Sequence, residues 1–204
     1  MRVGVIGLGS MGMGAALSAL RAGLAVTGCD PRAAARDEFI AAGGAAVAKA
    51  SDLPDGLEAL VVLVVNAAQT EAAVFGPDGA APRMAKGGVI ISSATMAPDG
   101  ARALAAKADA AGLLYLDAPV SGGAVKARAG EMTVMGAGSE AAFAKAAPVF
   151  DAIATKVWRL GSEIGIGATV KVVHQLLAGV HIAAAAEAMA LGIRAGADPQ
   201  ALYD

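Results

Sequence analysis

Short apolar runs alternate along the chain with segments that have the periodicity of helices. The apolar runs are rich in β-branched residues or leucine and are bounded by Gly, Pro or Asp, as buried strands are. Five runs are expected to form strands: Arg2–Leu8, Ala25–Asp30, Ala59–Val65, Gly88–Ser93 and Leu113–Ala118. Helices are expected between them, at Gly12–Ala22, Arg32–Ala42, Thr70–Phe75 and Pro98–Ala111. Nearly continuous apolar strands that alternate with helices predict an α/β fold, with a mostly parallel sheet covered on both faces.

Two further apolar runs follow in the second half of the chain. Glu131–Gly138 and Lys156–Gly161 read as strands, and a helix capped by Ser139 is expected between them. We expect both strands to extend the same sheet at its far edge.

The pattern changes again near the C-terminal end. An alanine-rich segment over residues 167–194 has the length and composition of a single long helix. Asp198 and Pro199 have the residue types of an N-cap and a first helical position, so another helix is expected to begin there. We therefore expect a first domain over residues 1–163. Residues 164–204 would hold a long interdomain helix and the start of a truncated domain.

Composition narrows the class of protein. Hydrophobic residues make up 56% of the chain and aromatic residues 3%, and much of the apolar content is alanine, so helices can approach a sheet closely. A net charge of −2 without a basic stripe argues against nucleic acid as a partner. The single cysteine, Cys29, excludes an internal disulfide, and no stretch reaches the roughly 18 uncharged apolar residues of a membrane span. We expect a cytoplasmic protein with no membrane partner.

The stretch GLGSMG, at Gly7–Gly12, follows the first expected strand and opens the first expected helix. There Gly7 permits a tight turn, Gly9 lets a pyrophosphate approach the backbone, and Gly12 lets the helix pack against the strand. Amide groups at the start of the helix then face the phosphate charge. This placement predicts a dinucleotide-binding sheet of the doubly wound Rossmann type. The expected contacts in the loop are Gly7, Leu8, Gly9, Ser10, Met11 and Gly12.

Asp30 ends the second expected strand, at about the distance from the glycine loop where a ribose contact is found. An acidic side chain there accepts hydrogen bonds from a ribose 2′-hydroxyl and repels a 2′-phosphate, which favours NAD over NADP as cofactor. Arg32 opposes this preference, because a nearby guanidinium tolerates the phosphate. Asp30 also has the residue type of a helix cap before Pro31, so a structural role is the alternative.

Four stretches together resemble the β-hydroxyacid dehydrogenase family, which includes 3-hydroxyisobutyrate and 6-phosphogluconate dehydrogenases. They are GLGSMGMGAALSALRAG at the glycine loop, SSATMAP before a helix, DAPVSGG at Asp117–Gly123 and the G-x-G-x-x-x-K run of Gly165–Lys171. The resemblance covers essentially the whole chain and implies an NAD-dependent dehydrogenase. In that family an all-helical C-terminal domain follows, and such a domain is expected to be missing here. Within the family, HQLLAGVHIAAAAEAMAL resembles the L-threonate dehydrogenases, which act on four-carbon sugar acids.

Lys171 is the residue that we expect to carry catalysis. Oxidation of an alcohol needs a base that takes the hydroxyl proton while hydride leaves carbon for the nicotinamide. Lysine in water is protonated at neutral pH, but partial burial beside a cationic nicotinamide lowers its pKa. An exposed helix lysine is the ordinary alternative, and it fits poorly between the apolar flanks GATV and VV. The resemblance likewise implies that Lys171 is the catalytic acid/base.

Ser121, Gly122 and Gly123 follow the end of an expected strand, where ligands bind in open α/β sheets. A hydroxyl and two unhindered amides can hold a substrate carboxylate. A plain Ser-Gly-Gly turn is equally compatible with the residues alone. The resemblance favours the substrate site.

His174 and Gln175 follow Lys171 by three and four residues, so a helix places all three on one face. They stand where most members of the resembled family have two asparagines. This difference favours a sugar acid over a small apolar substrate such as 3-hydroxyisobutyrate. Both side chains are expected to contact the substrate, and a satisfied core histidine is the alternative for His174.

Four residues carry weaker signals. Thr95 matches the threonine of the family's Ser-Thr-x-x-Pro turn near the nicotinamide, or else caps the following helix. Asn66 follows a strand at the edge where cofactor contacts are expected. His181 is expected to pack against a following helical domain, and its spacing from His174 is not that of a metal site, so no metal is expected. Cys29 is expected in the core.

The leading hypothesis is the NAD-dependent oxidation of a short sugar acid that resembles L-threonate. A tartronate semialdehyde or 3-hydroxyisobutyrate dehydrogenase is the enzymatic alternative. A chain that binds NAD without turnover is the alternative of another class. We also expect the full-length enzyme to be a homo-oligomer with a small hydroxy-acid substrate.

Overall fold

The computed structural model describes residues 1–204, which form a main sheet of six strands and a second sheet of three. The strands are β1 (Arg2–Ile6), β2 (Ala25–Cys29), β3 (Ala45–Val47), β4 (Leu57–Val62), β5 (Met84–Ser92), β6 (Leu114–Asp117), β7 (Val120–Ser121), β8 (Met132–Gly136) and β9 (Ala154–Arg159). The helices are α1 (Ser10–Arg21), α2 (Ala33–Ala41), α3 (Ala67–Phe75), α4 (Pro98–Ala110), α5 (Gly123–Ala129), α6 (Glu140–Ile153), α7 (Ile166–Arg194) and α8 (Pro199–Tyr203).

The main sheet is parallel throughout, in the order β3-β2-β1-β4-β5-β6. The chain winds outward from β1 in one direction through β2 and β3, and in the other direction through β4, β5 and β6. Loops on the two sides of this reversal separate at the carboxyl edge of the sheet, which is where such folds bind ligands. The expected doubly wound Rossmann-type sheet is confirmed.

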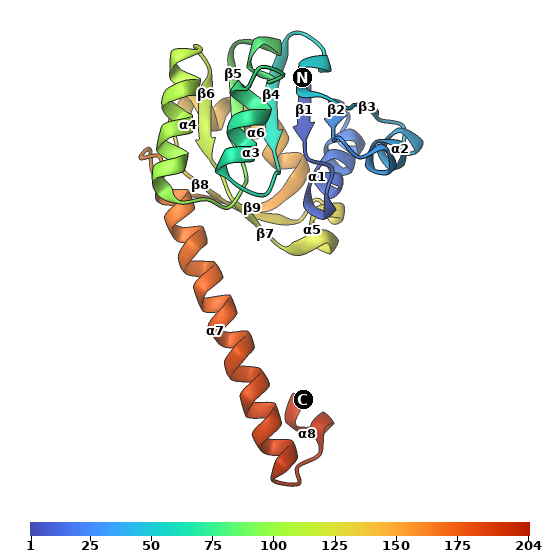
Figure 1. Cartoon of the computed structure of the whole chain (residues 1–204), viewed down its shortest axis with the longest axis vertical. Coiled ribbons are helices and arrows are strands. Elements are labelled where there is room, and N and C mark those ends of the chain that lie inside the picture. Colours follow the sequence, from blue (N-terminus) through green and yellow to red (C-terminus); the bar gives the residue numbers. More distant parts are fainter.

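Each face of the main sheet has its own hydrophobic core. Successive side chains of a strand point to opposite faces, and β4 shows this clearly. Ala59 and Val61 belong to the cluster that contains buried residues of α1 and α6. Leu60 and Val62 belong to the cluster that contains buried residues of α3 and α4. Helices therefore cover both faces of the sheet, and Figure 1 shows this layered arrangement.

The expectation that the last two strands extend the main sheet is wrong. β8 and β9 pair in parallel with each other, and β7 pairs antiparallel with β8, so the three form a separate sheet. The only ladder between β6 and this sheet is one isolated bridge between Asp117 and Ala137. β7 follows β6 after only two residues, too few for a crossover to a parallel position, so β7 turns away and pairs antiparallel with β8.

The expected helix ends in the second half of the chain are confirmed. The Ser139 side chain caps α6 by accepting a hydrogen bond from the Ala142 amide at 3.2 Å. Asp198 caps α8 by accepting from the amides of Gln200 and Ala201, and Pro199 is its first residue. α7 is a single helix of 29 residues. Figure 1 shows it leaving the body of the molecule, with α8 at its far end.

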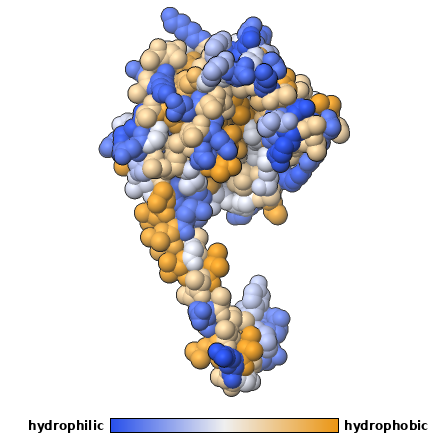
Figure 2. Space-filling model, viewed as in Figure 1, coloured by the Kyte–Doolittle hydropathy of each residue, from blue (hydrophilic) through white to orange (hydrophobic).

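Most of α7 is exposed, although it is apolar. Eight large hydrophobic side chains on it are exposed, among them Val173, Leu177 and Val180, and Figure 2 shows hydrophobic colour along the helix. By length and composition α7 is the one helix that could span a membrane, with a mean hydropathy of 1.8 over 18 residues. One such helix is by itself weak evidence for a membrane span.

Candidate active site

The glycine loop has the geometry that its sequence predicts. Gly7 has a φ of +90°, and a Cβ there would lie 2.5 Å from the Leu63 carbonyl oxygen. A Cβ on Gly12 would lie 1.7 Å from the Gly7 carbonyl oxygen, so only glycine lets α1 start this close to the turn. A Cβ on Gly9, the N-cap of α1, would meet no atom within 4 Å. The space beside Gly9 and the free amides of the first helical turn therefore fit a dinucleotide pyrophosphate.

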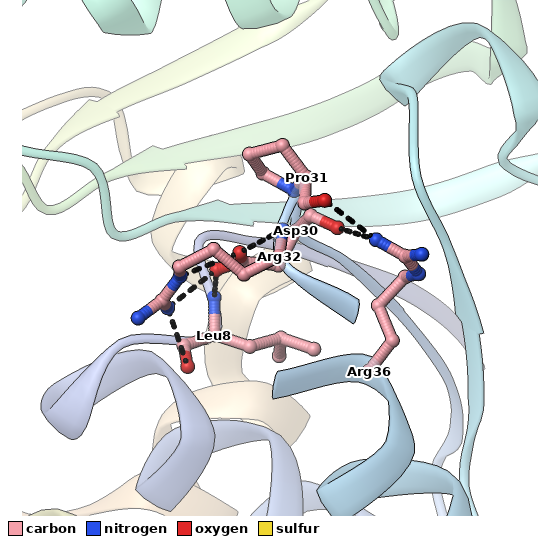
Figure 3. Close-up of polar contacts among 5 residues, drawn as sticks. All are labelled: Leu8, Asp30, Pro31, Arg32 and Arg36. Atoms are coloured by element: carbon pink, nitrogen blue, oxygen red, sulfur yellow. Dashed lines mark hydrogen bonds and ion pairs between the residues drawn. The ribbon is translucent and has the colours of Figure 1, made fainter. Parts of the chain in front are cut away.

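The Asp30 carboxylate holds this loop against the end of β2. One oxygen, Oδ2, accepts hydrogen bonds from the Leu8 amide and from the Arg32 guanidinium, both at 2.9 Å. The other oxygen, Oδ1, accepts from the backbone amide and from Nε of Arg32, again at 2.9 Å. Figure 3 shows the guanidinium lying across the carboxylate. Asp30 is 4% exposed, whereas the side chain of Arg32 is 63% exposed.

These contacts change the interpretation of Asp30. Burial alone would raise the pKa of its carboxyl, but the hydrogen bonds from Arg32 and Leu8 outweigh burial and lower the pKa. The N-cap of α2 is Arg32, which makes no side-chain cap, so the capping alternative for Asp30 is wrong. Four donors use the lone pairs of both oxygens. A ribose hydroxyl would therefore have to take the place of Arg32 to reach this carboxylate.

A cavity of about 650 Å³ opens beside the loop, and we call it the glycine-loop cavity. Gly7, Gly9, Asp30 and Arg32 line it, together with residues after β4. Of the other expected cofactor contacts in the loop, Leu8 is buried and Gly12 is packed against the turn. This cavity has the volume of a small-molecule binding site.

A second cavity, of about 360 Å³, is the lysine cavity. It contains Met11 from the glycine loop, Thr95 from the segment after β5, and Ser121, Gly122, Gly123, Lys171 and Gln175. The residues Leu63, Val64 and Val65 line both this cavity and the glycine-loop cavity. Residues from five distant parts of the sequence thus meet at the carboxyl edge of the sheet. Both cavities adjoin the segment that follows β4.

Lys171 is 7% exposed, even though α7 as a whole is exposed. Burial is the cause that lowers the pKa of its amine below the ordinary value of 10.5. No ion pair of Lys171 offsets the cost of holding its charge there. An exposed, solvated lysine is therefore wrong as a description of this residue, and its amine is more easily deprotonated than that of a surface lysine.

His174 and Gln175 do not share one cavity. Gln175 lines the lysine cavity, whereas His174 lines a third cavity of about 380 Å³ with Thr133 and Trp158. Ser121 lines both of these cavities. Nδ1 of His174 lies 3.2 Å from Oε1 of Gln175, so the two side chains form a hydrogen-bonded pair across the helix surface. Both residues are exposed, which excludes the core alternative for His174.

The residues with weaker signals separate in the structure. Thr95 does not cap α4, whose N-cap is Ala97, and it lines the lysine cavity instead. The Asn66 side chain caps α3 by accepting from the Gln69 amide at 2.9 Å, and it lines neither cavity. This cap gives Asn66 a structural role in α3.

Two further expectations concern residues away from the cavities. Cys29 is buried as expected, and burial, followed by the charge of Asp30, raises the pKa of its thiol to about 11. A reactive thiolate is therefore disfavoured. His181 is exposed on α7. No cluster of three or more His, Cys, Asp or Glu residues is arranged to hold a metal.

Sequence reasoning missed Ser93, which follows β5. Ser93 lines the lysine cavity and is 6% exposed, and its buried hydroxyl has no hydrogen-bond partner within the protein. A buried hydroxyl without a partner costs free energy, so such a group at a cavity wall points to a ligand. A single serine beside Thr95 in SSATMAP gives no pattern that would have distinguished it.

Two family matches cover the chain. Residues 2–161 match the family described as the NAD binding domain of 6-phosphogluconate dehydrogenase. Residues 165–204 match the family described as NAD-binding of NADP-dependent 3-hydroxyisobutyrate dehydrogenase. The nucleotide-binding geometry of the glycine loop thus agrees with the sequence match.

Individual relatives agree with the family matches. The chain is 54% identical to an L-threonate dehydrogenase of Cupriavidus necator over 99% of this chain and 68% of the relative. It is 52% identical to an L-threonate dehydrogenase of Escherichia coli K12 over 99% of this chain and 67% of the relative. A crystal structure described as a 3-hydroxyisobutyrate dehydrogenase from Salmonella typhimurium superposes with a TM-score of 0.93 at 53% identity, covering 100% of this chain and 71% of the other.

Proposed function

The chain belongs to the β-hydroxyacid dehydrogenase family. On this premise we propose that it oxidises L-threonate, or a closely related four-carbon hydroxy acid, with Lys171 as acid/base. It is an NAD-dependent oxidoreductase of hydroxy acids. The observation that carries the finer proposal is the lysine cavity, in which a buried amine lies with a Ser-Gly-Gly loop and the edge of the glycine loop. The names of the relatives support threonate as the substrate.

The chemistry assigned to Lys171 is proton transfer. NAD, when bound, accepts the hydride that leaves the carbinol carbon of the substrate. The neutral Nζ of Lys171 takes the proton of the same hydroxyl and becomes an ammonium, so the alcohol becomes a carbonyl. The lowered pKa of Lys171 supports this role, because more of the amine is neutral near pH 7 than for an ordinary lysine.

Substrate binding is assigned to the Ser-Gly-Gly loop and to α7. The Ser121 hydroxyl and the amides of Gly122 and Gly123 would hold the carboxylate by charge-assisted hydrogen bonds. Gln175 would bind a hydroxyl of the carbon skeleton, and His174 would hold the Gln175 amide in place through their contact at 3.2 Å. The partnerless hydroxyl of Ser93 gives this wall of the cavity one more donor for a polyhydroxylated ligand.

The cofactor contacts are assigned to the glycine-loop cavity and to Thr95. Gly7, Gly9 and the amides that begin α1, including those of Ser10 and Met11, would bind the pyrophosphate. The Asp30–Arg32 pair would meet the adenosine ribose, and Thr95 would lie nearer the nicotinamide. Asn66 is not retained as a contact, since its side chain caps α3.

A substrate panel tests the proposal. Initial rates of NADH formation would be measured with L-threonate, 3-hydroxyisobutyrate and other three- and four-carbon hydroxy acids. We expect the highest kcat/KM with L-threonate. A higher kcat/KM with 3-hydroxyisobutyrate would contradict the proposed substrate and leave the family intact.

One alternative follows from length. The chain spans 67–68% of the length of the relatives that it matches, so part of their structure has no counterpart among these residues. NAD titration beside the rate measurement separates the two possibilities. Binding of NAD without turnover of any hydroxy acid would support a nucleotide-binding unit that needs further protein for activity.

Organisation and location are also proposals. We propose a division at residues 163 and 164, a cytoplasmic location and homo-oligomers of the full-length enzyme. The break between the two family matches, at residues 161 and 165, supports the division. The exposed apolar side chains of α7 support an association with further protein.

A further inference from the structure

One buried carboxylate lies where the two sheets and α7 meet. Asp117 is the last residue of β6 and is 2% exposed. Its amide donates to the Ala137 carbonyl at 3.0 Å, and its carbonyl accepts from the Ala137 amide at 2.9 Å. This pair of bonds joins the main sheet to the smaller one. Neither the reaction nor the ligand contacts described above involve Asp117.

The carboxylate of Asp117 caps a helix to which it does not belong. Its Oδ2 accepts hydrogen bonds from the amides of Gly165 and Ala168, at 3.0 and 2.9 Å. Amides in the first turn of a helix have no acceptor within the helix, and α7 has no side-chain cap of its own. A negative charge at a helix N-terminus is also favourable. Asp117 therefore satisfies the start of α7 from the neighbouring sheet.

The approach of α7 to β6 is as close as the backbone allows. A Cβ on Gly167 would lie 2.5 Å from the Asp117 carbonyl oxygen and 3.0 Å from its Oδ2. The same atom would lie 2.7 Å from the Met135 carbonyl oxygen of β8. Any side chain at residue 167 would push the helix away from both sheets. The close approach at Gly167 and the two hydrogen bonds to Asp117 thus hold the first turn of α7 in place against β6.

That position determines where the amine of Lys171 lies. Lys171 is three residues after Ala168 and four after Gly167, so it projects from the same side of the helix, one turn further on. On the other side, Asp117 is four residues before Ser121 in the segment that leads to the Ser-Gly-Gly loop. Asp117 therefore links the segment that leads to Ser121 with the first turn of α7, which leads to Lys171.

We propose that Asp117 is a positioning residue for Lys171, whose carboxylate fixes the first turn of α7 and thereby the place of the Lys171 amine relative to Ser121. The inference rests on the proposed function for its catalytic meaning. The placement of the Lys171 amine by Asp117 does not depend on the proposed function, because the environment of this amine can be measured without substrate.

The experiment compares four variants of the whole chain. D117A removes the acceptor, and D117N keeps an oxygen acceptor without the charge. G167A keeps Asp117 but pushes the helix away from it. S139A is the matched control, because it removes the cap of α6, which holds no residue of the lysine cavity.

The readout is the pKa of Lys171, obtained by competitive acetylation at several pH values and mass spectrometry of its peptide, with Lys126 as internal reference. In D117A and G167A the pKa is expected to move up toward the ordinary 10.5, because the amine gains water when the helix start is displaced. In S139A it is expected to stay at the wild-type value. D117N is expected to stay near the wild-type value, since its oxygen can accept the same two amides.

Turnover gives an independent readout. D117A is expected to lose about 10²-fold in kcat with L-threonate, the scale of a misplacement of about 1 Å, while its affinity for NAD stays within about twofold. An unchanged Lys171 pKa in folded D117A or in G167A overturns the proposal, and G167A decides if D117A does not fold. If no hydroxy acid is oxidised but the Lys171 pKa responds to Asp117, the positioning role holds and the proposed function fails.

Discussion

At the scale of single residues, the carboxylate proposed to meet the ribose is already paired with the Arg32 guanidinium. Arg32 donates three hydrogen bonds to the Asp30 carboxylate, and its side chain stays largely exposed. A 2′-hydroxyl must displace the guanidinium to reach the carboxylate, whereas a 2′-phosphate can bind the guanidinium from outside.

Replacing Arg32 by alanine should therefore raise the preference for NAD. The Asp30 carboxylate would be free to accept ribose hydroxyls and to repel a 2′-phosphate, so the ratio of NADP to NAD dissociation constants should rise about tenfold. Isothermal titration with each nucleotide measures the ratio. R36A is the matched control, because the Arg36 guanidinium donates to the carbonyls of Asp30 and Pro31 and not to the Asp30 carboxylate. An equal ratio in wild type and R32A would remove Arg32 from nucleotide selection.

Burial of Lys171 should also appear as a pH dependence of stability. Its folded-state pKa is lower than its unfolded one, so between the folded value and 10.5 the unfolded chain binds more protons, and stability rises with pH. K171M has no buried charge, so it should be more stable than wild type at pH 7. That advantage should shrink as the pH approaches 10.5. Urea unfolding of both proteins at several pH values measures it, and a constant difference would mean that Lys171 is not destabilised by burial.

At the scale of elements, two glycines at the start of α1 should differ in their effects. One substitution should lower both folding stability and NAD affinity, and the other only NAD affinity. In G12A a Cβ would lie 1.7 Å from the Gly7 carbonyl oxygen, so both stability and NAD affinity should fall. In G9A the Cβ meets no protein atom, so the melting temperature should stay within about 2 °C of wild type, while NAD affinity falls at least tenfold. Differential scanning fluorimetry and NAD titration test the pair. Normal NAD binding by G9A would place the pyrophosphate elsewhere.

Most elements could be predicted from the sequence. In long strands and helices the pattern of hydrophobic positions extends over enough residues to be recognised even where single residues depart from it. It failed where elements are short. β3 and β7 have three and two residues, and α5 has seven, too few to show a period. β8 and β9 were recognised as strands, but their sheet was wrong, because pairing depends on how β7 turns rather than on the composition of β8 or β9.

The candidate site was predictable where spacing alone brings residues together. Lys171 and Gln175 are one turn apart on α7, and both line the lysine cavity. His174 lines the third cavity instead, because one residue on a helix turns the side chain by about 100°. The contact of Asp117 with α7 joins residues about fifty positions apart, and no local pattern reveals such a contact.

At the scale of the whole molecule, the lysine cavity lies between a closely packed domain and an exposed helix. Its walls come from the glycine loop, the segments after β4 and β5, the Ser-Gly-Gly loop and the first turns of α7. Beyond these turns α7 shows its apolar side chains (Figure 2). The cavity is thus assembled by the sheet edge and the first turns of α7.

The central claim is that Lys171 removes the proton as hydride leaves the substrate, and one measurement tests it most directly. Steady-state oxidation of L-threonate by K171M would be compared with wild type, with NAD affinity measured on the same samples. Loss of a general base should lower kcat by about 10²–10⁴-fold, with NAD affinity unchanged. A K171M variant that binds NAD and turns over L-threonate at the wild-type rate would contradict the claim.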